Sequence, residues 1–268
     1  MGLVTFVSHR GAPGTTTTAL AVAGAWPAAP ESRKLLVEMD SAGGVLALRL
    51  GLAEDPGLVS LAAATRHGMT RGELWDHAQL LSGGLAVVPG PSSISVATQL
   101  LAGSNGDLGR WFAGLTDVDV ILDAGRLAPH GPSASLVGAS DVAVMVAQPV
   151  AGQLHGAAQQ IVDLRSRGVR VGWCLAGEGP YSPTAVEEAY GVPVFGTIPT
   201  DARGATMIFG SAPSRKLIRT PLVRSATTLA AHLSGWLHDR RTPEPSAGLD
   251  GSAVLDPSPH DGTAEVTA

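Results

Sequence analysis

Residues 8–18 read Ser8-His9-Arg10-Gly11-Ala12-Pro13-Gly14-Thr15-Thr16-Thr17-Thr18. They follow an apolar run, Leu3–Val7, and precede a helix-like run, Ala19–Ala25. A strand, a glycine-rich turn and a helix in this order bring backbone N–H groups to a helix N-terminus, where they converge on phosphate oxygens and the helix dipole favours anions. Two glycines, Gly11 and Gly14, allow the backbone to curve in this way. The stretch therefore predicts a phosphate-binding loop. Its expected contact residues are Gly11, Ala12, Pro13, Gly14, Thr15, Thr16 and Thr17.

The loop lacks the lysine that P-loop sequences carry. That lysine precedes the Ser or Thr of the motif and reaches the β- and γ-phosphates, whereas this chain has Thr15 there. Thr16 stands where a hydroxyl would ligand Mg²⁺. Because a charge-assisted contact is worth about 1.5–3 kcal/mol, its loss predicts triphosphate affinity weaker by at least one to two orders of magnitude.

Composition bounds the class of protein. Hydrophobic residues make up 44% of the 268 residues, which is enough for a large core. The net charge of −5 gives no general attraction to polyanions, so we expect no nucleic-acid partner. The single cysteine, Cys174, excludes an internal disulfide. No apolar run reaches the length of a membrane span and the N-terminus lacks a signal peptide, so we expect a cytoplasmic protein.

Apolar runs that end in polar or glycine-rich turns alternate with helix-like segments. The expected strands are Leu3–Val7, Lys34–Met39, Leu85–Val88, Val118–Leu122, Val142–Ala147, Val169–Leu175 and Val192–Thr197. The expected helices are Thr17–Trp26, Gly57–His67, Ser95–Leu101, Gln153–Arg167, Pro183–Tyr190 and Leu222–Leu237. The strands are continuously apolar, as in sheets covered by helices on both faces. We therefore predict an α/β protein with a doubly wound, mostly parallel sheet that binds ligands at the carboxyl ends of its strands.

The composition changes close to residue 241. Pro, Ser, Gly, Asp and Glu dominate beyond it, and apolar runs disappear. We predict one domain over residues 1–240 and a disordered, acidic, Pro/Ser-rich tail over 241–268. After Arg241 the tail has no Lys or Arg, whereas amphipathic membrane anchors carry a basic face, so we expect no direct membrane binding.

Five motifs at strand ends resemble, in order, those of the ParA and MinD ATPases, whose Walker A motif is deviant. Residues 10–17, RGAPGTTT, resemble K-G-G-x-G-K-[ST]-T, and residues 36–44, LVEMDSAGG, resemble L-V-D-x-D-P-x-G. Residues 121–123 resemble a Walker B strand. Residues 140–149 resemble a strand that ends in a polar residue and Pro, and residues 191–201 resemble one that ends in I-P-x-D. The chain looks most like the divergent MinD-like proteins of actinobacteria and the TadZ/CpaE group of pilus-localisation proteins.

The resemblance implies a site for ATP and Mg²⁺ that is weakened, or lost, through Thr15. On the Mg²⁺ side, Thr16, Asp40 and Asp123 match the metal-binding positions. The candidate catalytic residues are Asp40, which matches the water-positioning aspartate, and Arg10. Arg10 matches a signature lysine that reaches the partner's phosphates across a nucleotide-sandwich dimer.

The same residue types also have structural explanations. Pro199 and Asp201 match a segment that flanks the base, or form an ordinary surface turn. Glu38 matches the first acidic position of its motif, or is a buried, paired carboxylate. The alternative for Asp123 is a helix cap or a salt bridge, for example to Arg126.

Three functions stay open. The first is a positioning or partitioning switch or scaffold that binds nucleotide weakly and has impaired or no ATPase activity. The second is an active ATP hydrolase in which Arg10, or an arginine donated by another subunit, replaces the lysine. The third is an interaction module that binds no nucleotide. The resemblance implies a homodimer and a protein partner in a positioning, partition or secretion/pilus assembly.

Overall fold

The computed structural model describes most of the chain up to its last long helix. The described residues are 2–9, 11, 14–27, 33–104, 106–128, 131, 133–210 and 216–238. The tail expected over 241–268 lies outside them, as does its boundary with the domain. Within the described part, no helix is long and apolar enough to cross a membrane.

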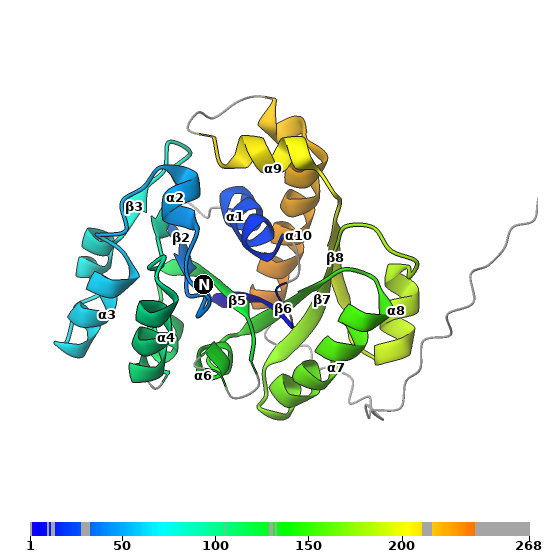
Figure 1. Ribbon diagram of the computed structural model, residues 1–268, viewed down its shortest axis with the longest axis horizontal. Helices are drawn as coiled ribbons and strands as arrows, with labels where there is room; N and C mark the ends of the chain where they lie inside the picture. Colours follow the sequence, from blue (N-terminus) through cyan, green and yellow to red (C-terminus); the bar gives the residue numbers. More distant parts are fainter. Residues whose placement is uncertain are drawn as a thin grey trace, which may run out of the picture.

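One eight-stranded sheet forms the centre of the fold, in the order β3-β4-β2-β5-β1-β6-β7-β8 (Figure 1). The strands are β1 (Leu3–Ser8), β2 (Arg33–Glu38), β3 (Gln79–Leu80), β4 (Ala86–Val88), β5 (Val118–Arg126), β6 (Val142–Ala147), β7 (Arg170–Ala176) and β8 (Val194–Ile198). All neighbouring strands are parallel except β3 and β4 at one edge. The predicted doubly wound, mostly parallel α/β fold is confirmed.

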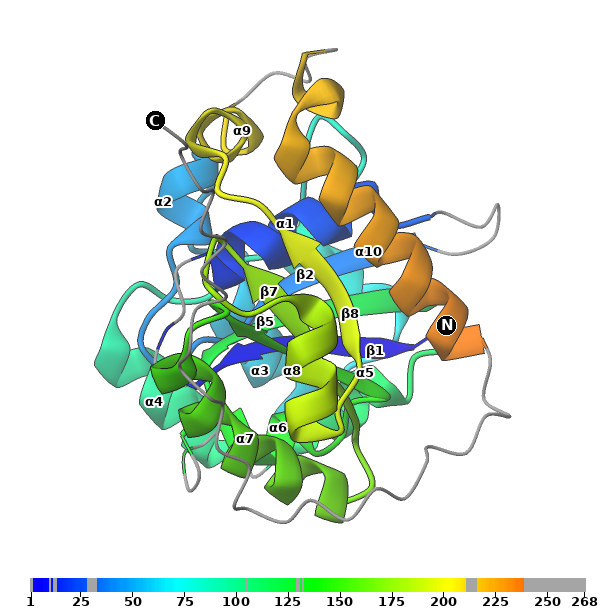
Figure 2. The same cartoon turned by 90° about the vertical axis from the view of Figure 1, so that its right-hand side faces the viewer.

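Helices cover both faces of the sheet (Figure 2). They are α1 (Thr15–Ala25), α2 (Leu46–Leu50), α3 (Leu58–Arg66), α4 (Ile94–Gly103), α5 (Asp107–Ala113), α6 (Ser133–Val137), α7 (Ala151–Ser166), α8 (Pro183–Tyr190), α9 (Ala202–Ile208) and α10 (Pro221–His238). Two 3₁₀ turns are η1 (Gly72–His77) and η2 (Leu217–Arg219). Helices α1 and α10 pack on each other over one face, and α3 to α8 cover the other.

Burial on both faces explains why the strands are continuously apolar. On β5, Ile121 packs in the cluster that contains α1 and α10. Its neighbours Val120 and Leu122 point to the opposite face and pack with α3, α4 and α5. Most residues along such a strand therefore meet a helix layer, which favours apolar side chains on both faces.

β1 lies between β5 and β6, and the chain leaves it through α1 toward β2 on the β5 side. The later strands β6, β7 and β8 are added on the other side of β1. The order of strands therefore reverses at β1, and in open α/β sheets ligands bind beside such a reversal, at the carboxyl ends of the strands. The loop after β1 begins at this point.

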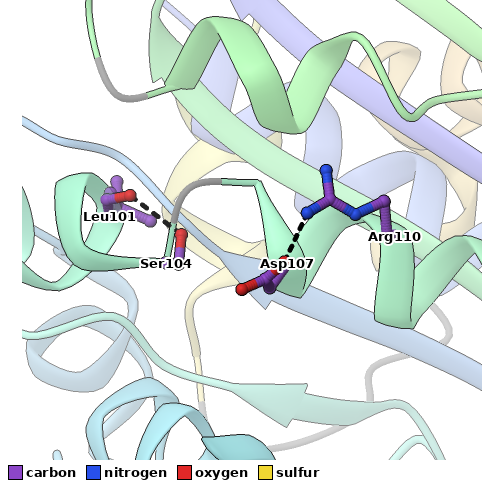
Figure 3. A network of polar contacts seen from close by, with 4 residues as sticks. All are labelled: Leu101, Ser104, Asp107 and Arg110. Carbon is purple, nitrogen blue, oxygen red and sulfur yellow. Dashed lines mark hydrogen bonds and ion pairs between the residues drawn. The ribbon is translucent and has the colours of Figure 1, made fainter.

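The sequence prediction omitted the shortest elements, namely α2, α5, α6, α9, β3 and the 3₁₀ turns. Such segments are too short to show a helical or strand period. The break between α4 and α5 illustrates this (Figure 3). The Ser104 hydroxyl donates to the Leu101 carbonyl (2.8 Å) at the end of α4, and Asp107 in the first turn of α5 pairs with Arg110 one turn later. These local polar contacts lie at the end of α4 and at the start of α5.

Candidate phosphate-binding site

The loop between β1 and α1 has the backbone shape that its glycines predict. Gly11 has φ 73° and Gly14 has φ 98°, both in the left-handed region that favours glycine. Space is not the reason for Gly14, because a Cβ there would meet no atom of the described residues within 4 Å. Three of the residues expected in this loop, Arg10, Ala12 and Pro13, lie outside the described residues.

The N-terminus of α1 begins directly after Gly14, at the end of this loop. The first hydrogen bond of the helix runs from the Thr18 N–H to the Gly14 carbonyl (2.7 Å), so the amides before Thr18 have no acceptor within the helix. The first turn of α1, all of which is described, contains no acidic residue. The positive end of the helix dipole is therefore not neutralised from within the helix, which favours an anion here.

A cavity of about 210 Å³ opens at this helix end. It is lined by Ser8, Gly11, Gly14, Thr15, Thr16, Thr17, Asp40, Ala42, Arg49, Gly125 and Arg126. The structure thus brings the described loop residues together with Asp40, as the sequence motifs suggested. Pockets for drug-sized ligands measure about 300–1,000 Å³, so this cavity matches the phosphate end of a ligand rather than a complete nucleotide.

Asp123 is fully buried behind the cavity, on β5. Its Oδ1 accepts a hydrogen bond from the Gly125 N–H (3.1 Å), and the Thr16 side chain hydrogen-bonds its carboxyl group. Among the described residues, its Oδ2 has no hydrogen-bond partner. Burial raises the pKa of Asp123 to about 7, and the nearby charges of Glu38 and Asp40 act in the same direction.

The oxygens of Thr16 and Asp123 fit a Mg²⁺ ion. Mg²⁺ prefers oxygen ligands, and a buried carboxylate oxygen without a partner is costly unless a cation or a donor completes it. Within the described part of the chain, no group of three or more His, Cys, Asp or Glu side chains could hold a metal. A Mg²⁺ ion here would therefore take most of its ligands from phosphate and water, as it does in many phosphate sites.

Asp40 lies directly after β2, half-buried at the cavity wall. Its Oδ1 accepts a hydrogen bond from the Ala42 N–H (2.8 Å). Burial raises the pKa of Asp40, while the backbone N–H groups of Ala42 and Arg126 and the Arg126 charge lower it. Its carboxylate packs against Gly125, where a Cβ would overlap with it. Asp40 is therefore held in a defined position at the edge of the cavity.

Glu38 is a buried carboxylate that is paired with backbone N–H groups, which agrees with the structural alternative considered for this residue. It accepts hydrogen bonds from the N–H groups of Val45 (2.7 Å), Leu46 (3.0 Å) and Gly90 (3.0 Å). Burial raises the pKa of Glu38, and these backbone hydrogen bonds oppose that rise. Glu38 thus connects the segments that follow β2 and β4 through hydrogen bonds. It is not among the residues that line the cavity.

Pro199 and Asp201 follow β8 and are not among the residues that line the cavity. Both carboxylate oxygens of Asp201 are used locally. Oδ1 accepts from the Gly204 N–H (2.8 Å) and caps α9, and Oδ2 accepts from the Leu222 N–H (3.1 Å) at the start of α10. These backbone hydrogen bonds lower the pKa of Asp201. Asp201 therefore connects the N-termini of α9 and α10 through hydrogen bonds.

Two arginines in the cavity wall were missed as site residues. Sequence analysis considered Arg126 only as an ion-pair partner for Asp123, but in the structure its guanidinium lies at Gly11 and its charge acts on Asp40. Arg49 comes from α2, a helix that the sequence did not predict, and its guanidinium lies 4.1 Å from the centre of the Phe209 ring. Only the position of Arg126, three residues after Asp123, offered a signal in the sequence.

Solved structures share this fold. A ParA family ATPase from Chlorobium tepidum TLS superposes with a TM-score of 0.70 at 19% identity, over 87% of this chain and 98% of that one. The cell division ATPase MinD from Pyrococcus furiosus gives 0.69 at 21% identity, over 88% and 99%. MinD from Pyrococcus horikoshii OT3, solved with Mg-ADP, gives 0.68 at 20% identity, over 87% and 95%.

Two further similar structures contain a macromolecular partner. One is the MinC:MinD cell division protein complex of Aquifex aeolicus (TM-score 0.64, 16% identity), and the other is pNOB8 ParA bound to nonspecific DNA (TM-score 0.58, 14% identity). No protein-family model and no curated protein matches the chain. At these identities the likeness shows the fold, and the chain has the fold of the ParA and MinD ATPases.

Proposed function

We propose that this chain, which has the ParA/MinD fold, is a positioning or partitioning switch or scaffold that binds ATP weakly and hydrolyses it slowly or not at all. The observation that carries the proposal is the cavity beside α1. It keeps Gly11 and Gly14 in left-handed conformations and the oxygens of Thr16 and Asp123 close together, yet it has Thr15 where a lysine would stand.

In this proposal the loop binds the phosphate chain through backbone groups. The N–H groups at the start of α1 donate to phosphate oxygens. Thr16 and Asp123 hold Mg²⁺, which when bound neutralises phosphate charge. Asp40 accepts a hydrogen bond from a water molecule and orients it near the terminal phosphate. Thr15 adds a hydroxyl but no charge, so developing charge on the phosphates is less well stabilised than with lysine.

A homodimer across the loop face is part of the proposal. Val45 and Leu48 beside the cavity and Ile94 on the neighbouring α4 have exposed apolar side chains, with 40%, 86% and 62% of their surface accessible. Their apolar surface would be covered in such a dimer. Arg10 would reach the partner's phosphates. Light scattering on the wild type, Leu48→Ser and Arg10→Ala tests this, and a concentration-independent wild-type monomer with and without MgATP contradicts it.

The macromolecular partner is a protein of a positioning, partition or secretion/pilus assembly, bound in a nucleotide-dependent way. The complex of MinD with MinC supports a protein partner by analogy of fold. The net charge of −5 does not exclude DNA, because pNOB8 ParA, which has the same fold, binds nonspecific DNA. Our expectation that nucleic acid is not a partner therefore has no support from the fold.

Thermal melting with and without nucleotide tests the proposal, together with a phosphate-release assay. Ligand at 100 times its Kd adds about 2.7 kcal/mol of stability, so millimolar MgATP should raise the melting temperature. We expect a smaller rise when EDTA replaces Mg²⁺, and slow or undetectable phosphate release. No rise at millimolar MgATP would contradict the proposal and favour an interaction module that binds no nucleotide. Rapid turnover would favour the active ATPase.

A further inference from the structure

We propose that Arg126 supplies, from within the same chain, the phosphate-binding cation that Thr15 cannot provide. Its guanidinium would bind the phosphate chain of a nucleoside triphosphate beside Gly11, with Arg49 as a second guanidinium at the same cavity. The inference rests on the proposed function and deepens it, because it names the group that makes binding of a triphosphate feasible without the lysine.

The guanidinium of Arg126 lies next to Gly11. A Cβ added to Gly11 would lie 3.1 Å from Nη2, 3.6 Å from Nε and 3.8 Å from Cζ of Arg126. Three atoms of the guanidinium are thus close to Gly11, and both residues line the cavity at the N-terminus of α1. The absence of a side chain at Gly11 leaves room for this contact.

The backbone that carries Arg126 is fixed beside the loop. In the sheet Arg126 pairs with Ser8, the last residue of β1. The Leu127 N–H donates to the Ser8 carbonyl (2.8 Å), and the Ser8 hydroxyl donates to the Gly125 carbonyl (3.2 Å). The Arg126 N–H also donates to the Asp40 carboxylate. The Cα of Arg126 therefore keeps its place relative to the loop, while its exposed side chain stays free to reorient toward a ligand.

Guanidinium groups outnumber carboxylates along the cavity wall, and the buried carboxylate of Asp123 lies behind it. Its described lining contains two guanidinium groups, those of Arg126 and Arg49, against one carboxylate, that of Asp40. Arg49 is placed by its contact with Phe209, since the guanidinium stacks on that ring with 4.1 Å between Cζ and the ring centre. Stacking occupies one face of the guanidinium and leaves its N–H groups, which lie in the plane, available to donate.

Arginine suits this task chemically. The guanidinium stays protonated at all physiological pH values and presents parallel N–H donors that bind two phosphate oxygens at once. Before ligand binds, the Arg126 charge acts on the Asp40 carboxylate. A triphosphate would draw the Arg126 guanidinium toward its own oxygens, because it carries more negative charge than one carboxylate.

Calorimetry with MgATP on the full chain tests the inference. We expect Arg126→Gln to weaken binding about 10- to 100-fold, as the loss of a charge-assisted contact does, and Arg126→Lys to weaken it less. Arg110→Gln is the matched control, because Arg110 is an exposed arginine on α5 that pairs with Asp107 and does not line the cavity (Figure 3). It should bind MgATP as the wild type does.

A second-site rescue separates a role in binding from a role in folding. In the Arg126→Gln background, Thr15→Lys returns a cation to the cavity. The double variant should bind MgATP at least tenfold more tightly than Arg126→Gln alone. Equal binding by the wild type and Arg126→Gln would overturn the inference and leave the proposed function standing. Loss of affinity without rescue by either lysine variant would also overturn it. Absence of MgATP binding by the wild type would overturn the proposed function and the inference together.

Discussion

The carboxylate of Asp40 packs directly against the Cα of Gly125, two residues after Asp123 on the neighbouring strand. This contact joins the ends of β2 and β5 and sets the distance between the two acidic positions of the site. Gly125 has φ 56° and its Cβ position is already occupied by the Asp40 carboxyl group. Both the backbone and the packing therefore require glycine here.

Substitution Gly125→Ala should displace Asp40 and destabilise the fold. Positive φ and overpacking each cost about 1–3 kcal/mol, so we expect a loss of at least that size in urea unfolding. MgATP binding should weaken as well. Gly24→Ala is the control, since Gly24 lies on α1 at ordinary φ with no atom within 4 Å of its Cβ position. It should be neutral or stabilising by up to about 1 kcal/mol. Equal effects of the two substitutions would contradict this account.

The buried Asp123 makes the stability of the nucleotide-free protein depend on pH. Its pKa is about 7 in the folded state against 3.8 ordinarily, because burial disfavours the charge. Between about pH 4 and pH 7 the folded state holds a proton that the unfolded state has released. The contribution of Asp123 to the free energy of unfolding is therefore complete below about pH 4. It falls by about 1.4 kcal/mol per pH unit as pH rises to about 7.

Asp123→Asn cannot lose this proton, so its stability should fall less than that of the wild type over this interval. Urea unfolding of both proteins at several pH values in EDTA measures the difference in slope. Parallel profiles for the two proteins would show that Asp123 ionises normally in the fold. The same substitution should remove the Mg²⁺ dependence of ATP binding, since it removes the charge of the carboxylate.

Asp201 should matter for stability more than for phosphate binding. Asp201→Ala removes the cap of α9 and the hydrogen bond to the start of α10, and loss of one helix cap costs about 0.5–2 kcal/mol. The pKa of Asp201 is lowered by these bonds, so its contribution is present above the ordinary pKa of Asp and is lost as pH falls toward the folded value. Unfolding at neutral and acidic pH measures this. Binding of inorganic triphosphate should be unchanged, and a loss there would contradict the structural role.

The sequence predicted the elements that are long or buried on both faces. The strand Val142–Ala147 and the helix Pro183–Tyr190 have the predicted bounds, since an apolar run ending in Gln-Pro and a helix beginning at a proline are clear local signals. Short elements such as α2 and α9 were missed because a single turn shows no period. Their absence from the prediction also hid Arg49, which α2 carries.

The site was predictable where a motif is local, and not where it depends on neighbouring strands. Thr16 and Asp123 were paired as metal-side residues through their motifs, and the structure places them in hydrogen-bonding contact. Arg126 could not be assigned to the loop, because its position over Gly11 depends on the pairing of β1 with β5. Sequence separation gives no information on such a contact between strands.

Calorimetry of ATP binding to the wild type and to Thr15→Lys, each in Mg²⁺ and in EDTA, tests most directly the claim that a weakened nucleotide site lies beside α1. The account predicts weak, Mg²⁺-dependent binding by the wild type. It also predicts binding at least tenfold tighter by Thr15→Lys, because the lysine adds a charge-assisted contact to a cavity whose other groups are in place. Micromolar or tighter binding by the wild type in EDTA, or no gain from the lysine, would contradict it.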